Sequence, residues 1–303
     1  MPHPAADPLP TGTFTFTTEA IDLRYHVHGT GPVCVAHPGG PGIAWDYLRS
    51  RALEEHLTMV YLEPAGTGDS SRLPSHPNGY TRARYSRHLT ALIDHLGAPR
   101  VHLLGHSHGG FVAQYHAVNS PDRLAGVILY DSAPLTGPEH VAEAMRQLER
   151  FAARHEGNPQ LDDVLKAFAA IPTISDDAQM QAVARGLLPA YFADYWAHET
   201  ELAPLRESLR SSYISGLDEH GTPDHIDDRD TLRALAVPTL VIAGRYDVIC
   251  GVRWAEQLHA LIPGSRLEIL EHSGHFGHLE EPEQFARAVA AFTDEVNARG
   301  AAR

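Results

Sequence analysis

The chain has 303 residues, 43% of them hydrophobic and 20% charged, which is the composition of a globular protein with a substantial core. Its formal net charge of -14 at pH 7, without a cluster of Lys and Arg, argues against nucleic acid as a partner, because binding phosphate requires a basic face. No run of residues reaches the roughly 18 to 20 apolar positions of a membrane span, and none forms the apolar core of a signal peptide, so we expect no membrane partner and no export.

The first half of the chain predicts a sheet in which strands alternate with helices. Residues 1–12 are rich in proline and are expected to be disordered or loosely docked. Residues 13–18 and 21–29 then alternate apolar and polar side chains, as an antiparallel pair of strands does. Short apolar runs that stop at polar or Gly-rich loops predict further, buried strands ending near residues 37, 62, 106 and 130. Helical spacing over 81–96 and 109–120 predicts helices between these strands. Strands that alternate with helices imply a mostly parallel sheet, with its functional loops at the carboxyl ends of the strands.

The stretch from 135 to 235 interrupts this alternation. Helical patterns follow one another there without an apolar strand between them, over 140–157, 162–171 and 179–196. Strand signals then return at 237–247 and 265–275. We therefore predict one core domain, formed by 1–134 and 236–303, with a helical cap of residues 135–235 inserted into it.

The sequence Gly105-His106-Ser107-His108-Gly109 lies where a predicted strand runs into a predicted helix. A nucleophilic serine in such a turn needs small residues two positions away on either side, because larger side chains would collide there. The free N–H groups and the positive dipole end of the following helix favour an oxyanion at the same place. A chance Gly-x-Ser-x-Gly in a loop would lack this strand-turn-helix context. We predict that Ser107 is a catalytic nucleophile.

A serine hydroxyl needs a base to remove its proton, and a histidine base needs a third group to hold its tautomer. His275 lies in the loop after one predicted strand and Asp247 directly follows another, so both are expected at the same sheet edge as Ser107. We predict His275 as the base and Asp247 as the acid. Asp131 also ends a predicted strand and is the alternative acid; its other role would be to brace the start of the inserted region.

Acyl transfer also needs donors for the developing oxyanion. One should be the backbone N–H of His108, the residue after the nucleophile. The other should come from the loop 37–42, whose glycines let main-chain N–H groups approach a substrate closely. Gly40 is the predicted second donor and Gly39 the alternative, while His37 is expected to brace the loop.

At these residues the chain resembles the proline iminopeptidase-like branch of the α/β-hydrolase fold. The resemblance lies in HPGGPG (37–42), GTGDS (66–70), GHSHGG (105–110), GRYDVIC (244–250) and SGHFGHLEEPEQF (273–285). These motifs span most of the chain outside the insertion. The resemblance implies an α/β-hydrolase fold with a helical cap over the active site and no cofactor. It also implies hydrolysis of N-terminal proline amides, other small amides, esters or lactones.

The chain departs from the iminopeptidase pattern at positions that bear on the substrate. Glu63-Pro64-Ala65 stands where iminopeptidases usually carry Asp-Gln-Arg, and leucines with Pro189 stand where a cap glutamate is expected to hold the free amine. Glu199 and Glu201 follow later and are alternative partners for an amine. Instead, apolar cap residues are expected to bind the substrate: Leu188, Tyr191, Phe192, Tyr195 and Trp196. Their spacing fits packing against the core equally well.

The predicted function is hydrolysis of a carboxylic ester or lactone with an apolar body, through an acyl-enzyme on Ser107. An aminopeptidase of the proline iminopeptidase type, or a small-amide hydrolase, is the alternative that uses the same triad. A non-catalytic receptor that keeps the fold is a third hypothesis, disfavoured because a receptor has no need of Ser107, Asp247 and His275 together.

The expected partner is a small-molecule substrate, with no cofactor. His272 and His278 flank His275 and suggest a metal site, but no HExxH or carboxylate-histidine spacing accompanies them, and no metal is expected. Cys34 and Cys250 lie in or beside predicted buried strands, which is typical of a reduced, cytoplasmic protein.

Overall fold

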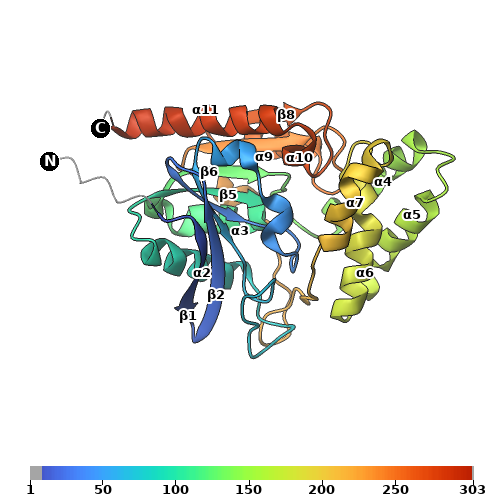
Figure 1. Ribbon diagram of the computed structural model, residues 1–303, viewed down its shortest axis with the longest axis horizontal. Helices are drawn as coiled ribbons and strands as arrows, with labels where there is room; N and C mark the ends of the chain where they lie inside the picture. The colour runs from blue at the N-terminus through green and yellow to red at the C-terminus, as the bar shows by residue number, and fades with distance from the viewer. Residues whose placement is uncertain (1–8, 302–303) are drawn as a thin grey trace.

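An eight-stranded sheet forms the centre of the molecule in the computed structural model, which describes residues 9–301 (Figure 1). The strand order is β1-β2-β4-β3-β5-β6-β7-β8; β2 pairs antiparallel with β1 and β4, and the remaining pairs are parallel. The strands are β1 (Gly12–Thr18), β2 (Ile21–His28), β3 (Val33–His37), β4 (Thr58–Leu62), β5 (Val101–His106), β6 (Leu124–Tyr130), β7 (Thr239–Gly244) and β8 (Arg266–Leu270). The predicted mostly parallel sheet is confirmed. Residues 1–8 of the proline-rich segment lie outside the described residues.

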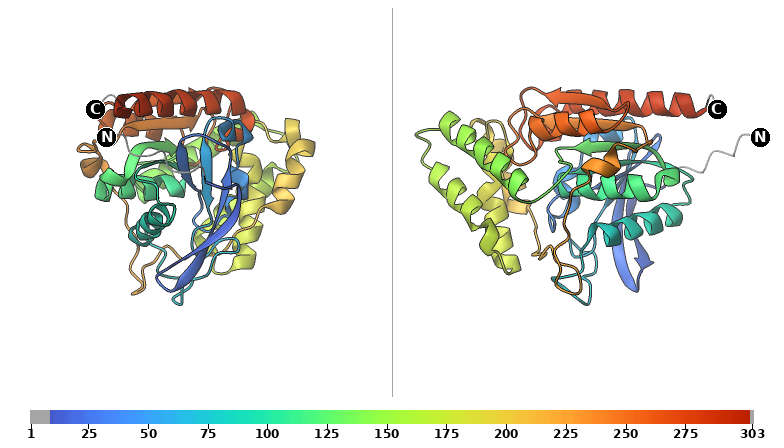
Figure 2. Two further views of the ribbon diagram at one scale, coloured as in Figure 1. Left: turned by 60° about the vertical axis from the view of Figure 1, so that its left-hand side comes forward. Right: turned by 180° about the vertical axis from the view of Figure 1, so that it is seen from behind.

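Helices cover both faces of this sheet (Figure 2). They are α1 (Arg51–Glu54), α2 (Arg82–His95), α3 (His108–Asn119), α4 (Pro138–Arg154), α5 (Leu161–Ala170), α6 (Asp177–Leu187), α7 (Glu199–Ser208), α8 (Arg229–Leu232), α9 (Val252–Leu261), α10 (Gly277–Glu280) and α11 (Pro282–Ala301). Short 3₁₀ turns are η1 (Trp45–Leu48), η2 (Pro121–Arg123), η3 (Ile171–Thr173), η4 (Leu188–Tyr191) and η5 (Trp196–His198).

The sequence of strand β6 is apolar throughout because the strand is covered on both faces of the sheet. Val127 and Leu129 belong to the cluster that packs α2, α3 and α9 against one face of the sheet, whereas Ile128 and Tyr130 belong to the cluster that includes α1 and α11. Successive side chains of a strand point to opposite faces, so a strand covered on both sides has no polar face. All of β6 except Ala125 is buried.

Helices α4 to α7 lie together at one end of the molecule, between β6 and β7 in the sequence (Figure 1). The spacing over 179–196 predicts a single helix, and this prediction is wrong. α6 ends at Leu187, and Pro189 follows in the 3₁₀ turn η4. Proline has no N–H for the helical ladder, and its ring crowds the preceding turn. We keep the name cap for residues 135–235; the division of the chain into domains at these positions stays a prediction.

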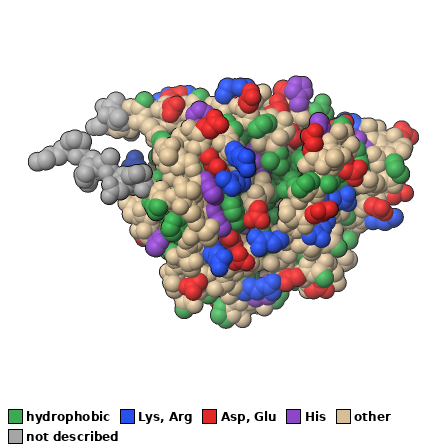
Figure 3. Space-filling view, in the orientation of Figure 1, with side chains coloured by type: hydrophobic (Ala, Val, Ile, Leu, Met, Phe, Trp, Pro, Cys, Tyr) green, Lys and Arg blue, Asp and Glu red, His purple; other side chains and the backbone are tan. Residues whose placement is uncertain are grey.

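Among the described residues, the surface shown in Figure 3 has no basic face, as expected from a sequence without a cluster of Lys and Arg. On the face in Figure 3, Lys and Arg side chains are interspersed with Asp and Glu rather than gathered in one basic region. Within residues 9–301, no helix combines the length and the apolar character needed to cross a membrane.

Candidate active site

Ser107 occupies a sharp turn between β5 and α3. Its backbone has φ 53° and ψ -117°, a strained conformation for a residue with a side chain, and its N–H donates to the Tyr130 carbonyl at 2.9 Å. A Cβ at Gly105 would lie 2.2 Å from the Gly109 carbonyl oxygen, and one at Gly109 would lie 2.2 Å from the His37 carbonyl oxygen. The steric demand expected from the motif is therefore present on both sides of the serine.

We expect Gly109→Ala to destabilise the protein by about 1–3 kcal/mol, as overpacking of a tight interior does. The added methyl would meet backbone oxygens of residues 37 and 38, which cannot move aside as a flexible side chain can. Thermal unfolding measures the change. Gly300→Ala is the control, because a Cβ at Gly300 in α11 meets nothing within 4 Å. Equal unfolding midpoints for the two variants would contradict this account of the turn.

His275 and Asp247 lie side by side after neighbouring strands. His275 Nδ1 is 2.9 Å from Asp247 Oδ2, and both side chains are buried. Asp247 Oδ1 accepts the backbone N–H groups of Ile249 at 2.7 Å and Cys250 at 3.1 Å. Burial opposes the charged form, but His275 and these two N–H groups hold the pKa of Asp247 below its usual value. An ionised Asp247 accepts a hydrogen bond from the Nδ1–H group, which keeps the ring proton on Nδ1 and leaves Nε2 of His275 free to act as a base.

Asp131, the alternative acid, is fully buried at the end of β6. Its Oδ1 accepts the Gly244 N–H at 2.9 Å. Burial, and next the carboxylate of Asp247, raise the pKa of Asp131 well above its usual value, which favours the protonated form of this carboxyl. Among the described residues, Asp247 is the acid that hydrogen-bonds to the His275 ring. This contact favours Asp247 as the acid of a triad.

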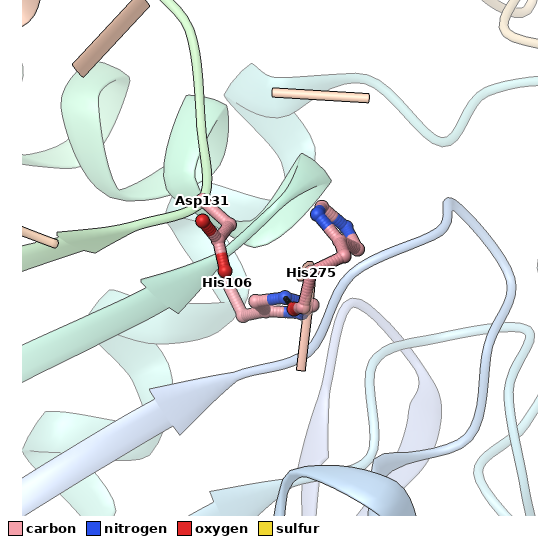
Figure 4. Close-up of side chains that lie close together, drawn as sticks. All are labelled: His106, Asp131 and His275. Atoms are coloured by element: carbon pink, nitrogen blue, oxygen red, sulfur yellow. Dashed lines mark hydrogen bonds between the residues drawn. The ribbon is translucent and has the colours of Figure 1, made fainter. Parts of the chain in front are cut away.

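His106, Asp131 and His275 also come close together, with one potential metal-ligating atom of each within 4.8 Å of the others (Figure 4). Both nitrogens of His106 are already hydrogen-bonded, however: Nδ1 to the Tyr47 hydroxyl at 2.7 Å and Nε2 to the His275 carbonyl at 3.0 Å. Burial, and then the neighbouring histidines, lower the pKa of His106 well below its usual value, so it carries one proton, on the nitrogen facing the carbonyl. His106 thus has no free nitrogen for a metal ion.

The two histidines that flank His275 do not form a metal site with it either. His278 Nδ1 is 3.0 Å from the Tyr130 hydroxyl, and its Nε2 donates to the Tyr47 carbonyl at 2.7 Å. His272 is exposed at the surface. His278 is therefore part of the packing around the site.

The two candidate glycines of loop 37–42 are distinguished by their N–H groups. Gly39 already donates its N–H to the Tyr47 hydroxyl at 2.6 Å. For Gly40, no acceptor of the N–H is found within residues 9–301. Gly40 has φ 123°, and a Cβ there would lie 2.6 Å from the Gly42 nitrogen, so the position requires glycine. His108 is the first residue of α3, and its N–H has no intrahelical acceptor.

A cavity of about 70 Å³ opens at Ser107. Its lining consists of Gly39, Gly40, Ile43, Tyr47, His106, Ser107, Tyr191, Ile249, His275 and Phe276. The cap contributes Tyr191 to this lining, and the tyrosine ring lies 5.3 Å from the His275 ring, measured between centroids.

The other four cap residues expected to bind substrate do not line this cavity. Leu188, Phe192 and Tyr195 are buried in the cluster that joins the cap to the core, and Trp196 packs on Phe151. Their apolar character is used for packing, the alternative left open by their spacing. Neither alternative glutamate lines the cavity: Glu199 accepts a hydrogen bond from Gln160, and the Glu201 side chain is 80% exposed.

A family model for the alpha/beta hydrolase fold matches residues 32–282. The chain belongs to the α/β hydrolase fold family. The resemblance found in the sequence motifs is thus confirmed, and the matched residues include both the cap and the candidate site.

Relatives match this α/β hydrolase over nearly its whole length. It is 27% identical to a proline iminopeptidase of Saccharolobus solfataricus, over 90% of this chain and 88% of that protein. Among solved structures, it is similar to a hydrolase from Pseudomonas aeruginosa (27% identity, TM-score 0.67, 95% of this chain and 98% of that one). It is also similar to a thermophilic esterase from Thermogutta terrifontis (25% identity, TM-score 0.66, 94% of this chain and 99% of that one).

Sequence reasoning missed the buried polar residues that connect the loops of this α/β hydrolase. The Tyr47 hydroxyl joins Gly39 to His106, and His106 in turn holds the carbonyl of His275. His106 stands next to the serine in the motif, which was a usable signal. Nothing local to Tyr47 indicates its role, because its partners lie 8 and 59 residues away in the sequence.

Proposed function

We propose that this α/β hydrolase cleaves uncharged carboxylic esters or lactones through an acyl-enzyme on Ser107. His275 is the general base, Asp247 holds its tautomer, and the N–H groups of Gly40 and His108 bind the oxyanion. The proposal is supported by the contact of 2.9 Å between His275 and Asp247 and by the strained turn that carries Ser107.

The reaction follows from these roles. Nε2 of His275 takes the proton of the Ser107 hydroxyl as Oγ attacks the ester carbonyl, and the two N–H donors stabilise the negative charge on the carbonyl oxygen. His275 then gives its proton to the departing alkoxide, leaving an acyl-enzyme. A water molecule activated by the same histidine releases the acid and restores Ser107. The side chains of Ser107 and His275, the two backbone N–H groups and water supply the groups for every step.

The observation that carries the substrate class is the lining of the cavity. None of its ten lining residues, drawn from the described part of the chain, is Asp or Glu. An aminopeptidase must hold an ammonium group, and burying that cation without a carboxylate costs several kcal/mol. Ile43, Tyr191 and Ile249 instead offer apolar or aromatic surface to an uncharged substrate.

We expect aryl esters or lactones to be cleaved with a much higher kcat/KM than prolyl-arylamides. Acylating a free amine on the substrate should change KM little, since no carboxylate of the lining is present to bind the ammonium form. Steady-state kinetics on the three substrate classes, with free and blocked amines, makes the comparison.

Proline iminopeptidase activity is the second candidate, because a protein of that name is 27% identical over 90% of this chain. It would replace our proposal if blocking the amine abolished cleavage, and if Glu199→Gln or Glu201→Gln weakened the binding of free-amine substrates alone.

A further inference from the structure

We propose that Glu280 is a positioning residue that fastens the cap to the loop of His275, so that the docked cap holds the catalytic base in place. The inference rests on the proposed function for the role of His275. It concerns a carboxylate outside the triad that binds backbone groups from two parts of the chain.

The two oxygens of Glu280 serve different segments. Oε2 accepts the N–H of Gly274, the residue before His275, at 2.6 Å. Oε1 accepts the N–H of Ala193, in the cap, at 2.8 Å. Hydrogen bonds to an ionised carboxylate are about twice as strong as neutral ones. One side chain at the end of α10 thereby joins the base loop to the cap.

The two segments are also in direct backbone contact. His275 donates its own N–H to the Tyr191 carbonyl at 2.7 Å. A Cβ at Gly274 would lie 2.6 Å from that same carbonyl oxygen and 2.9 Å from the carbonyl carbon of Phe192. Residues 274 and 275 therefore pack directly against the backbone of the cap segment 191–193. Loss of the Glu280 bridge would leave a single hydrogen bond, from His275 to Tyr191, to hold this alignment.

The adjacent Glu281 provides a matched comparison. Its Oε2 accepts the N–H of His272 at 2.9 Å and the hydroxyl of Ser273 at 2.6 Å. Both partners belong to the base loop. Glu281 thus holds the same loop as Glu280, with hydrogen bonds of similar length, but within residues 9–301 its side chain makes no hydrogen bond to the cap.

The charge on Glu280 changes near neutral pH. Burial raises the pKa of Glu280 to about 7, the N–H groups of Gly274 and Ala193 oppose the rise, and the carboxylates of Glu281 and Asp194 add to it. The groups at the end of β6 that sense its charge are Tyr130 and Asp131, whose pKa values are both raised. The two N–H bonds are strongest for the ionised form, so the bridge should weaken as the pH falls through this range.

The test compares Glu280→Gln with Glu281→Gln and the wild type. The rate of labelling by a fluorophosphonate reports how well His275 activates Ser107, and dividing each variant's rate by the wild-type rate at the same pH removes the pH dependence that the two proteins share. At pH 8.5 we expect Glu280→Gln to label about tenfold more slowly than wild type. The ratio should approach one at pH 5.5, where the side chain at position 280 is mostly uncharged in the wild type, as the glutamine of the variant is at any pH. Glu281→Gln should lack this pH-dependent ratio.

Amide hydrogen exchange tests the bridge without relying on chemistry at Ser107. We expect faster exchange in peptides covering both 189–195 and 271–277 for Glu280→Gln, and in 271–277 alone for Glu281→Gln. Should Glu280→Gln not fold, Glu280→Asp, which keeps the charge but is one methylene too short to span both partners, takes its place in the exchange measurement.

Equal labelling of Glu280→Gln and wild type at pH 8.5, a ratio independent of pH, or unchanged exchange in 189–195 would overturn the role of Glu280. A wild-type protein that is not labelled at all would instead overturn the proposed function, and the exchange data would still decide whether Glu280 fastens the cap.

Discussion

Ser107→Ala is expected to reduce kcat by about a millionfold, the loss found when the nucleophile of a serine triad is removed. The substitution deletes the atom that attacks the substrate and leaves the oxyanion donors, which act only once an attack has begun. Ser107 faces a cavity, and removing one oxygen atom there opens no gap in the core. The unfolding midpoint should therefore stay close to that of wild type.

Hydrolysis of an aryl ester and fluorophosphonate labelling measure this effect together. Ser132→Ala is the control, because Ser132 is also buried beside α3 but does not line the cavity. It should keep both activity and labelling. Ser107→Ala that retained more than a few per cent of wild-type turnover would rule out Ser107 as the nucleophile. An unlabelled wild type would favour the non-catalytic receptor.

Asp247→Asn is expected to lower kcat by about ten-thousandfold, as neutralising the acid of a triad does. Asp247 Oδ1 accepts two backbone N–H groups, so the asparagine carbonyl oxygen would keep that position and its amide nitrogen would face His275. The amide would donate to Nδ1 and force the ring proton onto Nε2. A histidine in that tautomer cannot accept the proton of Ser107.

Asp131→Asn should lower kcat by at most about tenfold. Burial and the carboxylate of Asp247 raise the pKa of Asp131 and so favour its protonated form, and asparagine is an uncharged side chain of nearly the same shape. Its carbonyl oxygen can still accept the Gly244 N–H. Kinetics of the two variants on one ester, at a pH where the wild type is fully active, gives the ranking. The opposite ranking would transfer the role of acid to Asp131.

Local sequence was sufficient wherever the chemistry depends on neighbouring residues. The turn at Ser107 needs Gly105 and Gly109, and all three stand within five positions, so their pattern carries the steric requirement with it. The positions of Asp247 and His275 could be predicted because parallel strands bring their carboxyl ends to one edge of the sheet. The family itself follows from motifs of this kind.

Tertiary structure decided every choice between chemically similar residues. Asp131 and Asp247 both follow a strand, and only the packing of β6, β7 and the His275 loop sets which carboxyl reaches Nδ1 and which has its pKa raised. Gly39 and Gly40 are adjacent in the sequence. In the fold, the Tyr47 hydroxyl of η1 accepts the N–H of Gly39, whereas no acceptor for the Gly40 N–H is found within residues 9–301.

The cap shows the same limit. The sequence determined that residues 188–196 are apolar and aromatic, but helical spacing does not say which side meets a substrate and which meets the core. The break at Pro189 turns Tyr191 toward the cavity and buries Leu188, Phe192 and Tyr195. The bridge through Glu280 joins positions 87 residues apart. Burial and hydrogen bonding between such distant segments exist only once the chain has folded, because they depend on the packing of the whole molecule rather than on local pattern.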